Sequence, residues 1–293
     1  MAKGYSLHLG LNSVDPKHYE GWSGELNACE NDARDMAAIA KAGQYTKSTL
    51  LLSRDATSTR FISEMMKLAR TLKSGDFLLL TYSGHGGQIP DADGDEDDKM
   101  DETWCLFDRQ LIDDEMYRLL GKFAPGVRIL VLSDSCHSGT ITRERIRATG
   151  LSQDELVHHI ARSAAESMRD HQQIDAEVRS RLAPIKVIED TYNKHKDLYL
   201  ALQSASAGAE KTPPKAGVIL ISGCMDGQLS LDGTANGLFT GILKSVWNSG
   251  KFEGGYRLFQ QTIVGHMPST QTPNLFLVGT VAPAFVNQRP FTV

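Results

Sequence analysis

Two stretches, FLLLTYSGHGGQ (residues 77–88) and VRILVLSDSCHSGT (residues 127–140), decide how this chain folds. Each begins with a run of apolar residues, which is typical of a strand buried on both faces of a parallel sheet. Each ends in a glycine-containing turn with one reactive side chain, His85 or Cys136. Because ligands sit beyond the carboxyl ends of parallel strands, we expect His85 and Cys136 to meet at one edge of the sheet.

The remaining segments predict an alternation of strands and helices. Strands are expected over residues 6–11, 49–52, 77–82, 128–132, 218–222 and 274–278, and helices over residues 26–42, 57–72, 113–122, 233–249 and 256–267. Such alternation indicates an α/β fold with a mostly parallel sheet flanked by helices. Asn27 and Thr57 are the candidate N-caps of the first two helices, because their side chains accept hydrogen bonds from free backbone N–H groups.

Composition excludes several classes of protein. The 293 residues carry a formal net charge of −5, so nothing indicates a nucleic-acid partner. No apolar run approaches the roughly 18 residues of a membrane span, and the N-terminus lacks the hydrophobic region of a signal peptide. The four cysteines are far apart, which argues against a disulfide framework or a zinc site. We therefore expect a cytoplasmic protein without membrane contact.

The spacing of His85 and Cys136 points to thiol chemistry. His85 lies 51 residues before Cys136, close to the separation between base and nucleophile in caspase-type enzymes. A thiol becomes a strong nucleophile when a neighbouring base removes its proton. The alternative, that both are buried structural residues, fits poorly because both occur in polar, glycine-rich turns.

At SGHG and DSCHSG the chain resembles the metacaspases, caspase-like cysteine peptidases of clan CD (peptidase family C14). The resemblance is greatest to the compact bacterial domains called orthocaspases, and it covers residues 6–140 and 217–279. It implies one caspase-like domain with a mostly parallel six-stranded central sheet. Residues 1–140 then form a large-subunit-like part, 141–216 a helical insertion or processing linker, and 217–293 a small-subunit-like part. The implied catalytic residues are His85 and Cys136, with the backbone N–H groups of Gly86 and Cys136 as the oxyanion hole.

The resemblance also implies a pocket for the substrate residue before the scissile bond, called P1. The matching positions are Cys29, Asp32, Ser83 and Asp134. Two carboxylates facing one pocket bind a guanidinium or ammonium group, so cleavage after Arg or Lys is expected. For Asp32 the alternative is a structural acid that interacts with the helix dipole.

An acidic loop, DADGDEDDKMDE (residues 91–102), follows the histidine motif. It is not an EF-hand, because Glu96 stands where the loop needs glycine. By resemblance, Asp101 together with Asp113 and Asp114 matches a metacaspase calcium site, although the segment between them is shorter here. The alternative is a solvated loop with Asp113 capping the next helix.

Residues 141–216 and the overall activity leave alternatives open. The linker is either a solvated helical insertion, with Leu156, Ile160 and Ala164 on one face, or a processing segment. Its candidate cut sites are Arg143, Arg145, Arg147, Arg162, Arg169, Arg179, Arg181 and Lys186. The leading hypothesis is an Arg/Lys-specific, calcium-stimulated cysteine endopeptidase that acts on protein substrates and is activated by autoprocessing. The others are a catalytically silent regulatory or scaffold protein, and a clan CD peptidase of other specificity that a partner protease or regulator activates.

Overall fold

The central sheet has six strands in the order β2-β1-β3-β7-β8-β9. In the computed structural model, which describes residues 1–92, 99–136, 150, 152–167, 179–209, 211–225 and 228–293, five of these strands are parallel. They are β1 (Gly4–Gly10), β2 (Lys47–Leu52), β3 (Phe77–Ser83), β7 (Arg128–Asp134) and β8 (Gly217–Ser222). Only β9 (Asn274–Gly279) runs antiparallel, beside β8. The predicted six-stranded, mostly parallel sheet is confirmed.

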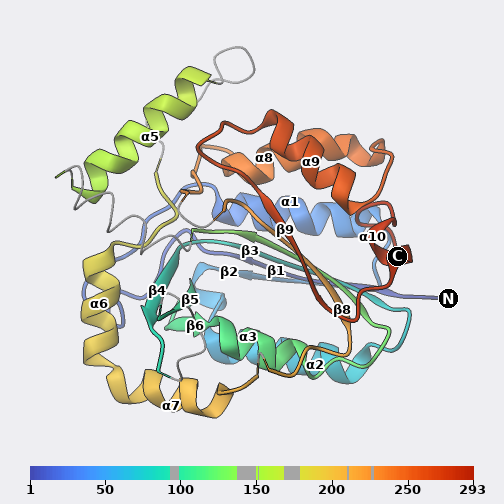
Figure 1. Cartoon of the computed structure of the whole chain (residues 1–293), viewed down its shortest axis with the longest axis horizontal. Coiled ribbons are helices and arrows are strands. Elements are labelled where there is room, and N and C mark those ends of the chain that lie inside the picture. The colour runs from blue at the N-terminus through green and yellow to red at the C-terminus, as the bar shows by residue number, and fades with distance from the viewer. Residues whose placement is uncertain (93–98, 137–149, 151, 168–178, 210, 226–227) are drawn as a thin grey trace.

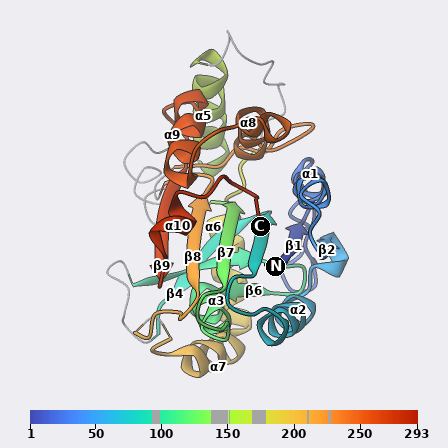
Figure 2. The ribbon, with the colours of Figure 1, turned by 90° about the vertical axis from the view of Figure 1, so that its right-hand side faces the viewer.

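Helices cover both faces of this sheet (Figure 1). On one face lie α1 (Cys29–Ala42), α8 (Leu238–Trp247) and α9 (Tyr256–His266), and on the other lie α2 (Ser58–Thr71) and α3 (Asp113–Leu120). Figure 2 shows the same layers along the sheet, with β9 and β2 at opposite edges. Apolar side chains of alternating strand positions, such as Leu78 and Leu79, enter the two separate core clusters. This burial on both faces explains why β3 and β7 are so apolar.

A second, three-stranded sheet was not expected from the sequence. It consists of β4 (Gly86–Pro90), β5 (Met100–Cys105) and β6 (Gln110–Ile112), all antiparallel. Because β4 begins at Gly86, the residue after His85, the second sheet continues directly from the turn that carries this histidine.

The segment between the two subunit-like parts is helical, as predicted. It contains α5 (Gln153–Ser167), α6 (Ile185–Lys194) and α7 (Lys196–Ser206). Helix α6 packs against β4 and α7 packs against α3, at the end of the molecule where the parallel strands terminate (Figure 1). Ala164 of α5 belongs to an apolar cluster and Ile160 packs against it, whereas Leu156 is buried outside that cluster.

Two predicted helix caps are wrong and one is confirmed. Thr57 caps α2 by accepting a hydrogen bond from the backbone N–H of Arg60 at 3.3 Å. Asn27 does not cap α1, since the helix begins one residue later and its N-cap is Ala28. Asp113 is the first residue of α3 rather than its cap.

The short remaining elements close the fold. They are the 3₁₀ turns Ser53–Asp55 and Asn248–Gly250 and helix α10 (Pro283–Val286).

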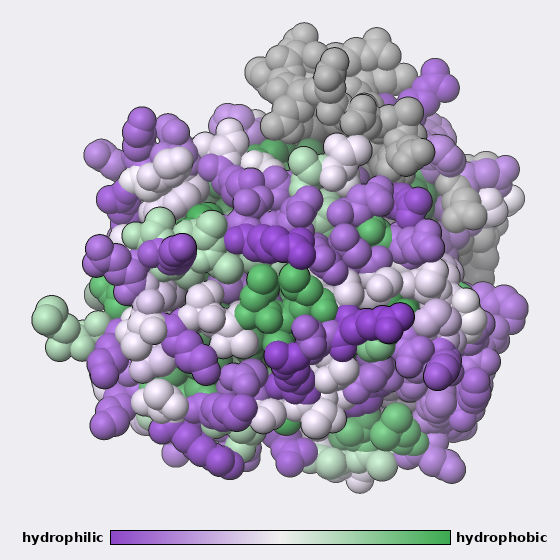
Figure 3. Space-filling model, turned by 180° about the vertical axis from the view of Figure 1, so that it is seen from behind, coloured by the Kyte–Doolittle hydropathy of each residue, from purple (hydrophilic) through white to green (hydrophobic). Residues whose placement is uncertain are grey.

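On the face opposite to the view of Figure 1, hydrophilic residues predominate and hydrophobic ones gather in small patches (Figure 3). In the part of the chain that the structure describes, no helix is long and apolar enough to cross a membrane.

Candidate active site

The register of β3 and β7 brings the two reactive side chains to the same edge of the sheet. Ser83 pairs with Asp134 at the last position of the parallel ladder. His85 and Cys136 each follow two residues later, and both are buried. The backbone N–H of Gly84 donates to the Asp134 carbonyl at 3.4 Å, which holds the two turns together. The pairing of the strands therefore places both residues at the carboxyl edge of the sheet, as predicted.

His85 is held in one orientation by a main-chain carbonyl. Its Nε2 bonds to the carbonyl oxygen of Gly24 at 3.2 Å, and its ring packs on Trp22 with 4.6 Å between centroids. Because a carbonyl oxygen only accepts, this bond places the proton on Nε2 and leaves Nδ1 free to accept one. Nδ1 has no hydrogen-bond partner among the described residues. Burial lowers the pKa of His85 to about 4, so the ring is neutral at pH 7.

The sequence gave no indication of Gly24 as a third participant. A main-chain carbonyl acts regardless of side-chain identity, so no motif marks it. Gly24 adopts φ +59°, and a Cβ placed there would lie 3.3 Å from the His85 ring. A glycine at this position therefore allows both the turn and the close contact with the base.

The sulfur of Cys136 lies against the backbone of Ser230. The Ser230 N–H donates to Sγ at 2.6 Å, and Sγ lies 3.4 Å from the Ser230 carbonyl oxygen. Ser230 belongs to the loop between β8 and α8, and the sequence did not mark this residue as part of the site. A backbone N–H that donates to the sulfur stabilises the thiolate.

The residues predicted to form the P1 pocket lie together, and the side chain of Arg181 from the linker lies among them. Arg181 is fully buried, with one guanidinium nitrogen 2.8 Å from Asp134. Its other terminal nitrogen lies 2.7 Å from Asp32 and 2.9 Å from Asp232. The pocket therefore presents three carboxylates, of which the sequence predicted two.

Neighbouring groups fix each of these carboxylates. Asp32 accepts from the Ser83 hydroxyl at 2.8 Å, and the Cys29 sulfur lies 4.0 Å from Asp232. The four predicted pocket residues are thus brought together. Burial, reinforced by Asp134, raises the pKa of Asp32 even though Arg181 opposes the shift.

Asp134 and the far wall of the pocket involve residues that sequence reasoning missed. Asp134 accepts from the hydroxyls of Ser230 and Thr240 at 2.6 and 2.7 Å. Gly237 lies so close to Arg181 that a Cβ would be 2.3 Å from its guanidinium nitrogen. Any side chain at Gly237 would therefore take the space of the arginine head group.

The backbone around Arg181 is bound in an extended conformation across the site. The Gly86 N–H donates to the Arg181 carbonyl at 2.9 Å, and the Arg181 N–H donates to the Ser230 carbonyl at 3.0 Å. Before Arg181, the Asp232 N–H donates to the Arg179 carbonyl at 2.8 Å. After it, the Ala183 N–H donates to the Gly86 carbonyl at 2.9 Å. Strand-like pairing on both sides of one residue is how extended peptides bind to proteins.

Comparison with known proteins agrees with this geometry. Residues 14–275 match the family model described as "Peptidase_C14: Caspase domain". The chain belongs to the caspase-domain family of cysteine peptidases. It is 48% identical to protein GSU0716 from Geobacter sulfurreducens, whose crystal structure superimposes with a TM-score of 0.84 over 99% of both chains.

More distant members of the caspase-domain family support the same assignment. Metacaspase-1 of Coccidioides immitis is 30% identical over 260 residues, which are 81% of this chain and 52% of that protein. Metacaspase-1 of Botryotinia fuckeliana is also 30% identical, over 81% of this chain and 58% of its own length. The chain thus spans about half the length of these relatives. Caspase-1 of Spodoptera frugiperda, 10% identical with a TM-score of 0.51 over 94% of this chain and 86% of its own, shares the fold.

The three candidate calcium ligands of this caspase domain lie on β5 and at the start of α3. The β5–β6 ladder ends at the pair Thr103 and Ile112, so Asp101 lies beyond it on β5 while Asp113 and Asp114 open α3. Asp101 accepts from the side-chain amide of Gln203 in α7 at 2.8 Å. Oxygen donors suit Ca²⁺, but the described residues contain no group of three acids, histidines or cysteines arranged for a metal. Residues 93–98 lie outside the described part, so the calcium site stays a prediction.

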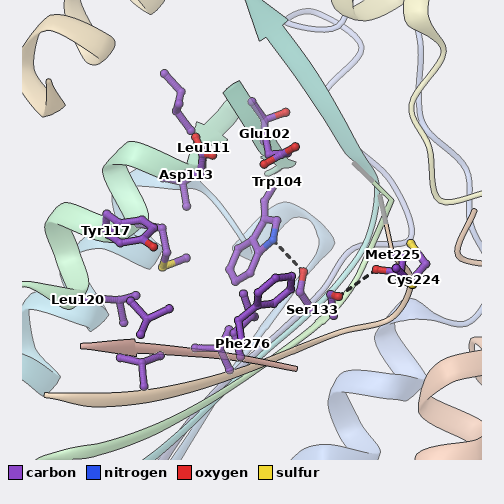
Figure 4. Close-up of a pocket in the computed structure, with 18 residues that line it drawn as sticks. Glu102, Trp104, Leu111, Asp113, Tyr117, Leu120, Ser133, Cys224, Met225 and Phe276 are labelled. Carbon is purple, nitrogen blue, oxygen red and sulfur yellow. Dashed lines mark hydrogen bonds between the residues drawn. The ribbon is translucent and has the colours of Figure 1, made fainter. Parts of the chain in front are cut away.

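A separate cavity of about 370 Å³ lies between α3, β5 and the face of β7–β9 (Figure 4). Trp104, Tyr117 and Phe276 line it, and the Trp104 indole N–H donates to the Ser133 hydroxyl at 3.0 Å. None of the residues of the P1 pocket contributes to its walls. Cys224 does line it and also belongs to the apolar cluster that contains Cys136, so the cavity adjoins that cluster.

Proposed function

We propose that this protein is a cysteine endopeptidase that cleaves peptide bonds after arginine, and more weakly after lysine. We further propose that Arg181–Leu182 is the first bond it cleaves in its own chain. The observation that supports this most is the pose of Arg181. Its guanidinium lies among three carboxylates while its carbonyl oxygen accepts from Gly86, the predicted oxyanion donor.

The chemistry follows from the groups around the Arg181 carbonyl. The Cys136 sulfur attacks the carbonyl carbon, and the thiol proton passes to Nδ1 of His85. The negative oxygen of the tetrahedral intermediate is stabilised by the Gly86 N–H. His85 then gives the proton to the Leu182 nitrogen as the peptide bond breaks. Water hydrolyses the resulting thioester, which frees Cys136 and leaves Arg181 as a new carboxyl terminus.

The preference for arginine over lysine rests on the shape of the head group. The guanidinium uses two nitrogens to reach carboxylates on three different elements. A lysine ammonium is a single point and cannot span them at the same distances. An aspartate at P1 would meet three like charges, so caspase-type specificity for acids is disfavoured.

In the described conformation the linker occupies the site that a substrate needs. Arg181 must leave the pocket before another protein can bind, so the intact chain is a closed form. Self-cleavage, or a partner protease or regulator that displaces the linker, would open it. A catalytically silent regulatory protein is the second candidate, and the observation in its favour is the same fully buried Arg181.

We also propose that calcium weakens the contact that holds α7 in place. Asp101 holds α7 through Gln203, whose amide also donates to the Pro90 carbonyl at 2.7 Å. A cation bound by Asp101 and Asp114 would compete with the Gln203 amide and loosen α7. Thermal denaturation with and without Ca²⁺, for the wild type and Asp101→Asn, tests this. A calcium-dependent shift that the variant lacks supports the site, and identical shifts in both proteins contradict it.

The main test combines self-cleavage with peptide turnover. Intact-mass analysis should show a cut between Arg181 and Leu182 in the wild type and none in Cys136→Ala. Fluorogenic peptides with P1 Arg should be cleaved faster than P1 Lys, and P1 Asp should not be cleaved. An uncut wild-type chain that cleaves none of the three peptides, with or without Ca²⁺, would favour the silent protein instead.

A further inference from the structure

The residue after the scissile arginine is buried as completely as the arginine itself. Leu182 is 4% exposed and belongs to an apolar cluster that contains the catalytic cysteine. The other buried members of that cluster are Ala164, Cys224, Leu229 and Leu231. Val157 and Ile160 of α5 pack against it from outside. The position called P1′, directly after the cut, therefore has an apolar subsite of its own.

The backbone fixes Leu182 in this subsite. Gly86 donates to the carbonyl before Leu182 and accepts from the N–H of the residue after it, Ala183. These two bonds form a parallel bridge between Leu182 and Gly86. Because Gly86 is also the oxyanion donor, correct seating of the P1′ residue and correct placement of the scissile carbonyl depend on the same residue.

Apart from the linker, the residues that line this subsite are leucines and a cysteine. Leu229 and Leu231 are each 2% exposed, and Cys224 is 6% exposed with its thiol directed to the Ser135 carbonyl at 3.5 Å. The carboxylates that bind the arginine lie in the neighbouring pocket, and the described side chains that form this cluster are aliphatic or thiol groups. A charged P1′ side chain would lose its hydration without gaining a partner.

We propose that the enzyme selects substrates by an aliphatic side chain of leucine size directly after the scissile arginine, in addition to the arginine itself. This selection rests on the proposed peptidase activity and names its substrate class more closely: Arg followed by a Leu-like residue. Apolar subsites discriminate by about 10–200-fold for a single methylene group. We therefore expect Leu or Met at P1′ to raise kcat/KM by at least about 10-fold over Ala, and by more over Asp.

The test uses the full chain and internally quenched peptides built on its own sequence around the cut. The peptides have the form Arg-Ser-Arg-X-Ala, with X as Leu, Met, Ala or Asp. The expected order of kcat/KM is Leu and Met, then Ala, then Asp. Equal turnover of all four would overturn the P1′ proposal while supporting the peptidase. No turnover of any peptide would overturn both.

A substitution in the proposed subsite tests the same inference independently of the peptide series. In Leu229→Ser the ratio of Leu to Ala turnover should fall at least about 3-fold, while the preference for P1 Arg over P1 Lys should stay. Ratios measured on one preparation do not depend on the fraction of folded enzyme. An unchanged Leu-to-Ala ratio would contradict the assignment of Leu229 to the subsite.

Discussion

Replacing Arg181 should separate its two roles, as a bound substrate and as a structural cation. Its guanidinium joins α1, β7 and the loop before α8 through Asp32, Asp134 and Asp232. Arg181→Ala leaves these three buried carboxylates without a cation. To observe stability alone, the change is made in Cys136→Ala, in which no self-cleavage occurs.

The expected loss can be worked out from the contacts. Removing one partner of a buried ion pair costs about 3–5 kcal/mol, because the remaining charge is left without compensation. Unfolding entropy of about 2.1 cal/mol/K per residue gives roughly 0.6 kcal/mol/K for a chain of 293 residues. The melting temperature should therefore fall by about 5–8 °C. Arg181→Lys keeps the charge but contacts fewer carboxylates, so it should lose about half as much.

Differential scanning calorimetry at pH 7 measures these shifts. Arg34→Ala is the matched control, because Arg34 forms an exposed pair with Glu30 one helical turn away. Such pairs contribute about 0.3–0.5 kcal/mol, so this control should shift by less than about 1 °C. The loss in Arg181→Ala should also shrink at low pH, where the carboxylates take up protons. A melting temperature within about 1 °C of the parent at pH 7 would refute the reasoning.

Three further predictions concern the pocket and the core. Gly237→Ala places a methyl group in the space of the P1 guanidinium. The value of kcat/KM for P1 Arg peptides should therefore fall roughly 100-fold, a size typical of a 1 Å displacement. Gly265→Ala is the control and should change kcat/KM little, because the space around Gly265 is open. Asp232→Asn removes one of the three negative charges around the P1 guanidinium. It should lower kcat/KM for P1 Arg peptides about 10–100-fold, since a hydrogen bond to a charged group contributes about 1.5–3 kcal/mol. An unchanged kcat/KM would mean that Asp232 does not bind substrate. Burial lowers the pKa of His8 to about 3, so between pH 6.5 and 3 the unfolded chain binds more protons and stability falls as the pH falls. From pH 7 to 5 this amounts to about 2 kcal/mol, and chemical denaturation of His8→Leu should show a pH dependence weaker by that amount.

Most strands of the central sheet were predictable because the inner ones, such as β3 and β7, are apolar on both faces and end in recognisable turns. The second sheet was not, because β6 has only three residues and a charged loop separates β4 from β5. Short strands of mixed polarity form by pairing with a neighbour, and the local sequence does not report that neighbour. The helix before Cys136 was found, but its cap was misjudged because Ile112 has no polar side chain.

Several side chains of the candidate site were predicted from the sequence, whereas the backbone contacts to them were missed. His85, Cys136, Asp32 and Asp134 stand in or beside motifs. The Gly24 carbonyl and the Ser230 N–H act through atoms that every residue has, so no spacing identifies them. Arg181 was one of eight candidate cut sites, and only the fold distinguishes it from the others. Arg143, Arg145, Arg147 and Arg169 lie outside the described residues.

Under the proposed function, the three-way contact of Arg181 links the stability of the chain to the presence of an arginine in the site. While the linker arginine is in place, it neutralises the charge that gathers where α1, β7 and the α8 loop converge. Once it has left, only an incoming arginine restores that neutrality, and ligand binding adds to stability as RT ln(1 + [L]/Kd). An opened enzyme without substrate is therefore its least stable form.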